Sequence, residues 1–152
     1  GAQAAGVSGV DIDAATVAFA RAYHGSDTVR FESADVTRAP CLDRSVDLVT
    51  SFETIEHVAD PGAVVAEFAR VLRVGGMLVL STPNDQGLTA FHEQSLTMAD
   101  LDDLLADGFH VVHRLGQRAG NDPVVGDLPP GMFPFDDAGT EAETLVVVAQ
   151  RV

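Results

Sequence analysis

The sequence has little positive charge, a single cysteine and no long apolar run. Nine Lys and Arg residues stand against 23 Asp and Glu residues in 152, which gives a formal net charge of −14. Nucleic acids and anionic membrane surfaces both attract clustered Lys and Arg, so we expect neither as a partner. No apolar segment approaches the roughly 20 residues that span a bilayer. These absences predict a soluble, cytoplasmic protein.

The single cysteine, Cys41, excludes any feature that needs two thiols in the chain. One thiol cannot form an internal disulfide, and it is compatible with a reducing cytoplasm. A zinc site built on cysteines is excluded as well, and we expect no metal site. With 46% hydrophobic and 21% charged residues the composition is ordinary for a globular protein, and 152 residues suit one domain.

Strand-like apolar runs alternate with helical stretches along the chain. That alternation is typical of a mostly parallel sheet with helices on both faces, which is a Rossmann-like three-layer α/β sandwich. We expect strands over residues 6–13, 29–35, 46–52, 77–83, 109–117 and 143–150. We expect helices over residues 14–23 and 97–108, with Asp13 and Thr97 as N-caps, and a third helix within residues 61–76, with Pro61 near its start and Gly75 just past its end. Residues 1–152 are expected to form a single domain.

The last part of the chain departs from strict alternation. Residues 118–140 are rich in Gly and Pro without periodicity, and we expect a long loop there. The strands on either side of this loop have no helix between them, which predicts a C-terminal antiparallel hairpin on the sheet. A nicotinamide-dependent oxidoreductase of the Rossmann type would keep alternating strand and helix, so the hairpin disfavours that function.

Three motifs follow one another in the middle of the chain. They are E-H-V-x-D-P at residues 56–61, R-V-L-x-x-G-G at residues 70–76 and S-T-P-N at residues 81–84. A structural interpretation of the first is a solvated helix start, where acids suit the positive end of the dipole. Together, however, the motifs resemble the core of the class I S-adenosylmethionine-dependent methyltransferases that include the ubiquinone and sugar-modifying O-methyltransferases.

The resemblance runs from about Gly9 to Gln117. It implies S-adenosyl-L-methionine as the cofactor and methyl transfer to a small-molecule acceptor, with a hydroxyl oxygen as the favoured acceptor atom. The alternative is a degenerate methyltransferase fold that serves as a non-catalytic binding or scaffold module. The sequence leaves open whether a second copy of the chain is a further partner, in a homodimer.

The resemblance also implies cofactor-binding residues where three strands end. These are Asp11, Ile12, Asp35, Val36, Ser51, Phe52 and Glu53. Asp11 corresponds to the acid that accepts hydrogen bonds from both ribose hydroxyls, whereas Asp13 is better explained as a helix cap. Asp35 and the backbone N–H of Val36 correspond to the groups that meet the adenine edge, with a turn acid as the alternative for Asp35. Phe52 is expected to pack against the cofactor, or else in the core.

The implied catalytic candidates are His57 and His92. In the family the Glu56–His57 pair follows the strand at the cleft rim, beside the transferable methyl group, and a histidine at the place of His92 lies at the mouth of the acceptor pocket. An imidazole that titrates near neutrality can take the proton of a hydroxyl acceptor as the methyl group arrives. His57 has a structural alternative, a turn cap hydrogen-bonded to Glu56. Alignment can supply most of the acceleration in a methyl transfer, so a base is not required. The other histidines are interpreted as structural or surface residues: His24, His110 and His113.

One family feature is missing from the sequence. The family's first strand and the G-x-G-x-G loop after it are not found in these 152 residues. We therefore expect an N-terminally incomplete domain, or one that has lost cofactor binding. The missing strand would lie between the strands that end at Asp11 and Phe52, and its absence predicts a row of unpaired backbone groups on each.

Overall fold

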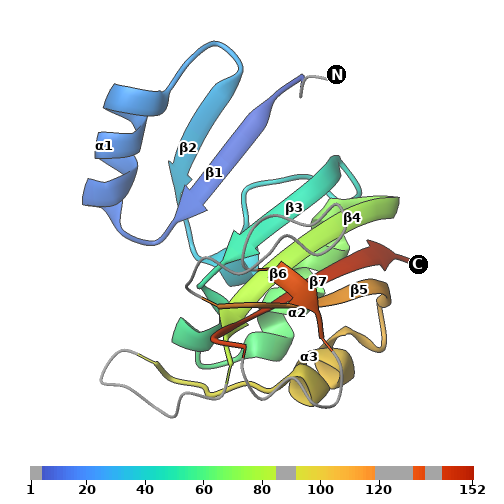
Figure 1. Ribbon diagram of the computed structural model, residues 1–152. Helices are drawn as coiled ribbons and strands as arrows, with labels where there is room; N and C mark the ends of the chain where they lie inside the picture. The colour runs from blue at the N-terminus through green and yellow to red at the C-terminus, as the bar shows by residue number, and fades with distance from the viewer. Residues whose placement is uncertain (1–4, 85–91, 119–131, 136–141) are drawn as a thin grey trace. The chain divides into compact units, whose positions relative to one another are not determined.

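The computed structural model describes residues 5–84, 92–118, 132–135 and 142–152 of the chain (Figure 1). Its contacts divide the chain into two compact units, Gly1–Leu42 and Asp43–Val152, and each unit is described by itself. Most of the expected loop at residues 118–140 lies outside the described residues.

The first unit is a parallel strand pair with one helix. Its elements are β1 (Val7–Asp11), α1 (Ala14–His24), β2 (Val29–Ser33) and the 3₁₀ helix η1 (Val36–Arg38). β1 and β2 run parallel, with Val7 opposite Val29 at one end and Asp11 opposite Ser33 at the other. The Oδ1 of Asp13 accepts a 2.6 Å hydrogen bond from the N–H of Thr16, which confirms Asp13 as the N-cap of α1.

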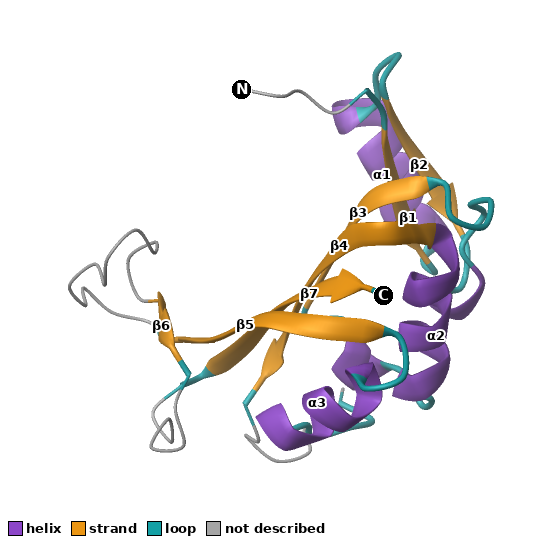
Figure 2. Cartoon of the chain, turned by 90° about the vertical axis from the view of Figure 1, so that its right-hand side faces the viewer, coloured by secondary structure: helices purple, strands orange, loops and turns teal. Residues whose placement is uncertain are grey.

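The second unit holds a five-stranded sheet in the order β3-β4-β7-β5-β6. Its elements are β3 (Val46–Phe52), η2 (Ile55–His57), α2 (Pro61–Val71), β4 (Leu72–Pro83), α3 (Met98–Leu105), β5 (Phe109–Gln117), β6 (Met132–Pro134) and β7 (Thr144–Arg151). β3 and β4 are parallel, whereas β7 pairs antiparallel with both β4 and β5. The expected antiparallel strand at the end of the chain is confirmed. Figure 2 shows α2 and α3 on one face of this sheet.

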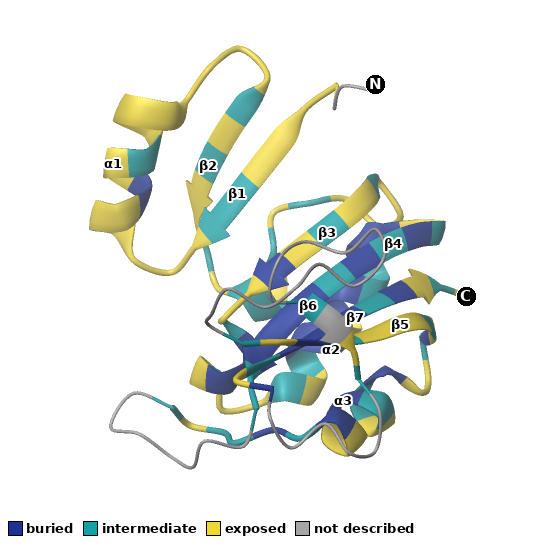
Figure 3. Ribbon diagram, in the orientation of Figure 1, coloured by how far each residue is buried: buried dark blue, intermediate teal, exposed yellow. Residues whose placement is uncertain are grey.

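The hydrophobic core of the second unit lies between that face and the two helices. The apolar stripe expected on α2 is buried, with 0–6% of each residue exposed: Val64, Val65, Phe68, Val71 and the following Leu72. Leu101 and Leu105 of α3 and Leu78 and Leu80 of β4 are fully buried. Figure 3 shows the same concentration of buried residues along β4, β7 and α2.

The boundary between α2 and β4 differs from the expectation. The helix was expected to end just before Gly75, but it ends at Val71, and β4 begins at Leu72. The carbonyls of Arg70 and Val71 accept hydrogen bonds from the N–H groups of Arg44 and Ser45, so the end of the helix is satisfied by the segment before β3. Gly75 takes its left-handed φ of 77° within β4 rather than at a helix end.

Another difference concerns the expected loop at residues 118–140, which contains β6. Residues 132–134 pair antiparallel with residues 115–117 of β5. A three-residue strand that contains Pro134 carries too short a pattern for periodicity to reveal it.

Each of the two sheets ends on a strand that the resemblance places beside the missing first strand. Among the described residues, β1 pairs with β2 alone and β3 pairs with β4 alone. In the described part of the chain, one edge of β1 and one edge of β3 therefore have no neighbouring strand.

Candidate functional site

The candidate cofactor residues of the first unit lie where β1 and β2 end. Asp11 is the last residue of β1, and its Oδ1 accepts a 2.8 Å hydrogen bond from the N–H of Asp13. A carboxylate has a second oxygen, so this bond leaves Asp11 able to accept from a hydroxyl. Ile12, the next residue, is 76% exposed. Both residues are accessible, as a cofactor contact requires.

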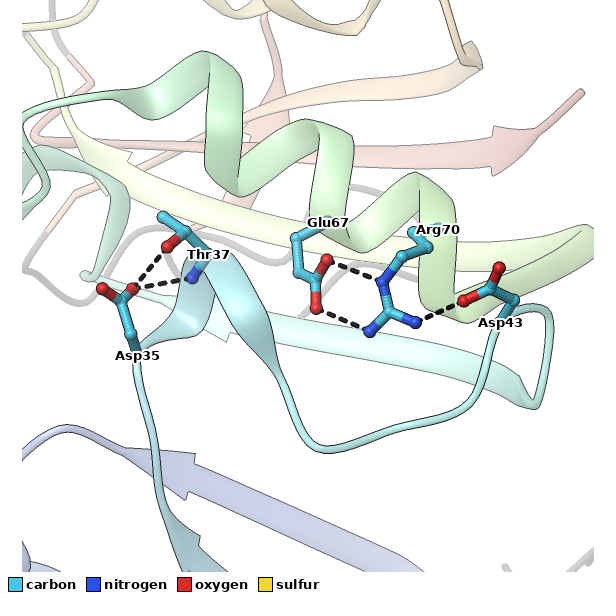
Figure 4. Close-up of polar contacts among 5 residues, drawn as sticks. All are labelled: Asp35, Thr37, Asp43, Glu67 and Arg70. Carbon is cyan, nitrogen blue, oxygen red and sulfur yellow. Dashed lines mark hydrogen bonds and ion pairs between the residues drawn. The ribbon is translucent and has the colours of Figure 1, made fainter.

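Asp35 caps the 3₁₀ helix η1 and is held by Thr37. Its Oδ1 accepts from both the N–H and the hydroxyl of Thr37, each at 2.8 Å (Figure 4). The hydrogen bond from the N–H of Thr37, followed by the bond from its hydroxyl, lowers the pKa of Asp35 below its ordinary value. Asp35 is therefore a turn acid in its local structure. The contact of Asp35 with adenine stays a prediction, and so does the contact of Val36, the first residue of η1, with adenine.

The end of β3 carries an unusual buried hydroxyl. Ser51 is 8% exposed, and its Oγ has no hydrogen-bond partner in the part of the chain that the structure describes. A buried hydroxyl without a partner is unfavourable, and a bound ligand that hydrogen-bonds to it removes that penalty. The neighbouring Phe52 is 57% exposed, so the core alternative for Phe52 is wrong.

Glu53 is held in a strained conformation by β4. Its φ of 49° lies in the left-handed region that non-glycine residues seldom adopt. The N–H of Glu53 donates to the carbonyl oxygen of Ser81 at 3.2 Å, and the hydroxyl of Ser81 donates to Glu53 Oε1 at 2.7 Å. These bonds fix the point where the chain leaves the sheet.

Glu56 is a buried carboxylate in η2, with 2% of the residue exposed. The hydroxyl of Thr82 donates to Glu56 Oε2 at 3.1 Å. The other oxygen, Oε1, has no hydrogen-bond partner among the described residues. The backbone carbonyl of Glu56 accepts from the N–H groups of Glu93 and Gln94 at 2.8 and 3.0 Å. η2 is thereby tied to the segment that carries His92.

The structure brings the two candidate histidines together beside Glu56. The rings of His57 and His92 meet edge to face, with centroids 5.1 Å apart. The Nε2 of His57 lies 3.6 Å from Glu56 Oε1, which is longer than a hydrogen bond, so the structural alternative for His57, a turn cap hydrogen-bonded to Glu56, is not what the structure shows. We call Glu56, His57 and His92 the histidine cluster; they are of the type and spacing that could hold a metal ion.

Each histidine was predicted separately from the sequence, but the position of the Glu56 side chain beside them was not predicted. The signal was present in the E-H-V-x-D-P motif, where a glutamate precedes the histidine directly. The remaining histidines lie elsewhere: His24 is the last residue of α1, and His110 and His113 are exposed on β5. Their interpretation as surface residues fits these positions.

A family model described as "Methyltransferase domain" matches residues 2–80, which is just over half of the chain. The chain belongs to this methyltransferase family. A probable S-adenosylmethionine-dependent methyltransferase of Mycolicibacterium smegmatis is 40% identical over 119 residues, covering 72% of this chain and 46% of that protein. A ubiquinone biosynthesis O-methyltransferase of Pseudomonas paraeruginosa is 32% identical over 83 residues, covering 53% of this chain and 36% of that protein.

The fold agrees with the family. A methyltransferase solved in complex with the Haloferax volcanii Trm112 methyltransferase activator superposes with a TM-score of 0.74 at 25% identity, covering 96% of this chain and 71% of that one. The expected Rossmann-like α/β fold is confirmed, and S-adenosylmethionine is the cofactor of the family. The chain spans less than half the length of the curated relatives that it matches first.

The residues of this methyltransferase family member suit that cofactor. Asp11 offers an exposed carboxylate at the end of β1, and Ser51 offers a buried hydroxyl without a partner among the described residues. The cofactor carries both hydroxyl donors and charged groups, which are the counterparts that these side chains need. In the described part of the chain no helix is long and apolar enough to cross a membrane.

Proposed function

We propose that this protein transfers a methyl group to a hydroxyl oxygen of a small molecule. The observation that carries the proposal is the pairing of His57 and His92 just beyond the end of β3, in a chain of the methyltransferase family. One relative is named for the same chemistry, the O-methyltransferase of ubiquinone biosynthesis. The acidic surface, with a net charge of −14, disfavours nucleic acid as the acceptor.

Seven residues are proposed to hold the cofactor. Asp11, with Ile12 beside it, would accept from the ribose hydroxyls, and Asp35 with the N–H of Val36 would meet the adenine edge. Ser51, Phe52 and Glu53 would contact the remainder of the molecule. When bound, S-adenosylmethionine supplies an activated methyl group on a sulfonium.

His57 and His92 are proposed to meet the acceptor hydroxyl. His57 has 44% of its side chain exposed and His92 is half-buried, so both can be reached by a small molecule. Glu56, in the same cluster, accepts hydrogen bonds from the hydroxyl of Thr82 and from the backbone N–H groups of residues 93 and 94. A rigid support of this kind orients an acceptor, and orientation can supply most of the rate enhancement of a methyl transfer.

The test uses methyl-deuterated S-adenosylmethionine and a protein-free small-molecule extract of Mycolicibacterium smegmatis. We expect a labelled product whose methyl group is bonded to oxygen, identified by mass spectrometry and NMR. Binding of S-adenosylhomocysteine is measured in parallel by calorimetry. Label found only on nitrogen or carbon would contradict the oxygen acceptor. Failure to bind S-adenosylhomocysteine would favour the scaffold alternative.

A further inference from the structure

The histidine cluster combines two imidazoles and one carboxylate. This is a ligand set of catalytic zinc sites, and the same donors also suit other divalent transition metals. We propose that Glu56, His57 and His92 bind one divalent transition-metal ion of the zinc type. The sequence did not indicate such a site, because the cluster joins a motif after β3 to a residue of a different segment.

The distances within the cluster fit one ion. Ligand atoms of Glu56, His57 and His92 all lie within 4.8 Å of one another. Zinc holds nitrogen and oxygen ligands at about 2.0 to 2.2 Å, which places two tetrahedral ligands about 3.3 to 3.6 Å apart. The separation between Glu56 Oε1 and His57 Nε2 is 3.6 Å. Any pair at the 4.8 Å limit would have to close by about 1.2 to 1.5 Å to reach that geometry.

The arrangement of the two rings also fits. Imidazoles bound to one tetrahedral ion at such distances have ring centres about 5 Å apart. The centroids of His57 and His92 lie 5.1 Å apart, with an angle of 70° between the ring planes. Face-to-face stacked rings could not direct their nitrogens to a common point, and the 70° angle shows that these rings are not stacked in that way.

Glu56 supplies the second, independent observation. Its Oε1 is buried without a hydrogen-bond partner among the described residues, and this is the oxygen that faces His57. A buried polar oxygen without a hydrogen bond is unfavourable, and a metal ion bound there would remove that penalty. The other oxygen is already held by Thr82, an outer-shell contact of the kind that orients metal ligands.

The cluster would leave one position of the ion open. Three protein ligands and a fourth free position are the arrangement of catalytic rather than structural zinc sites. The exposed side chain of His57 places that position where a small molecule can enter. Its occupant would be an oxygen ligand, and the acceptor hydroxyl is the candidate. That last step rests on the proposed function, whereas metal binding itself does not.

The experiment measures metal binding without cofactor or acceptor. The untagged protein is freed of metal by a chelator and titrated with ZnCl₂ by calorimetry and with CoCl₂ by visible absorption, which reports tetrahedral coordination. We expect one ion per chain. His57→Ala and His92→Ala should each weaken zinc binding by roughly a hundredfold or more, since ligands matter at least as much as outer-shell partners. Excess MgCl₂ should not compete, because Mg²⁺ prefers oxygen ligands.

The matched control is the double variant His110→Ala/His113→Ala, which removes two exposed imidazoles from β5. It should keep wild-type zinc affinity. Glu56→Gln keeps the side-chain volume and should also weaken binding, and circular dichroism checks that this buried substitution leaves the fold intact. Wild-type affinity in both His57→Ala and His92→Ala would overturn the proposal, as would loss of binding in the β5 control. Neither result bears on whether S-adenosylhomocysteine binds, so the two proposals can fail separately.

Discussion

Thr82 Oγ1 donates a 3.1 Å hydrogen bond to Glu56 Oε2, and both residues are buried. This bond joins the S-T-P-N motif at the end of β4 to the E-H-V-x-D-P motif after β3. One residue earlier, Ser81 makes a parallel connection through its 2.7 Å bond to Glu53 Oε1. The S-T-P-N motif thus provides hydroxyl donors both to the E-H-V-x-D-P motif and to Glu53, the residue that follows β3.

Removing the donor of this bond should destabilise the protein. Thr82→Val keeps the shape of the side chain but takes away a hydrogen bond from a buried carboxylate. We predict a loss of about 1 to 3 kcal/mol in the free energy of unfolding, measured by urea titration. Thr50→Val, at an exposed position of β3, is the matched control and should stay within about 0.5 kcal/mol. Equal effects of the two substitutions would show that the bond to Glu56 contributes nothing.

The capping box of α3 makes stability depend on pH. The hydroxyl of Thr97, and then its N–H, donate hydrogen bonds to Asp100 and lower its pKa below the ordinary value of 3.8. Because the folded-state pKa is depressed, the stabilisation is fully present above 3.8 and is lost as the pH falls through the folded-state value. Asp100→Ala should therefore cost about 0.3 to 1.5 kcal/mol at neutral pH and less in acid.

Urea titrations of the wild type and Asp100→Ala between about pH 2.5 and pH 7 measure this difference. Asp103→Ala, at an exposed position of the same helix, is the control and should show no comparable change with pH. A penalty for Asp100→Ala that is as large in acid as at neutral pH would contradict the assignment.

Asp11→Ala should weaken cofactor binding more than the loss of another surface carboxylate. The substitution removes a charged acceptor proposed for the ribose hydroxyls, and each such hydrogen bond is worth about tenfold or more in affinity. Calorimetry with S-adenosylhomocysteine measures the loss. Asp27→Ala, at an exposed position of the same unit, should leave the affinity unchanged. If the two variants bind alike, Asp11 is not part of the site.

The Ser51→Ala variant tests whether the Ser51 hydroxyl contacts a bound ligand or another group of the protein. The Oγ of Ser51 has no partner in the described structure, so its removal should leave the free energy of unfolding unchanged or slightly raised. Affinity for S-adenosylhomocysteine should fall, because the cofactor is the proposed partner of this hydroxyl. Ser81→Ala, which removes the bond to Glu53, should instead lower stability. A stability loss in Ser51→Ala would point to a partner within the protein.

His57→Ala and His92→Ala should each slow methyl transfer. We predict a rate lower by about 10²-fold in the deuterated-methyl assay, with affinity for S-adenosylhomocysteine within a few-fold of wild type, as expected when an acceptor loses its alignment. His113→Ala on β5 is the control. Full transfer rates in both cluster variants would remove them from the acceptor site.

Features set by neighbouring residues could be predicted from the sequence. Asp13 and Thr97 were predicted correctly as N-caps, because an N-cap depends only on its own side chain and on the next few backbone groups. The apolar stripe of α2 was correct for the same reason, since its 3.6-residue period is local. The bounds of β3 and β5 agreed because each is a short stretch in which Val, Leu and Phe recur among polar residues, with polar or glycine-containing segments before it.

Features that depend on residues far away in the sequence could not be predicted from the sequence. α2 ends early because residues before β3 take up its last carbonyls, and the glycines at 75 and 76 gave no sign of this. The burial of Glu56 depends on Thr82, 26 residues along the chain. Its position beside His92 depends on the hydrogen bonds from Glu93 and Gln94. A single sequence gives each of these residues a type but not a neighbour.

The place of β7 in the sheet has a consequence for how the protein is made. β7 follows all other described strands in the sequence, yet it lies between β4 and β5, with Met77 opposite Gln150 and Phe109 opposite Arg151. On the ribosome, β4 and β5 must therefore wait for residues 144–151 to emerge before the middle of the sheet can form. Pairings so distant in sequence make folding slow, and until then the backbone groups of β4 and β5 that pair with β7 lack their partners.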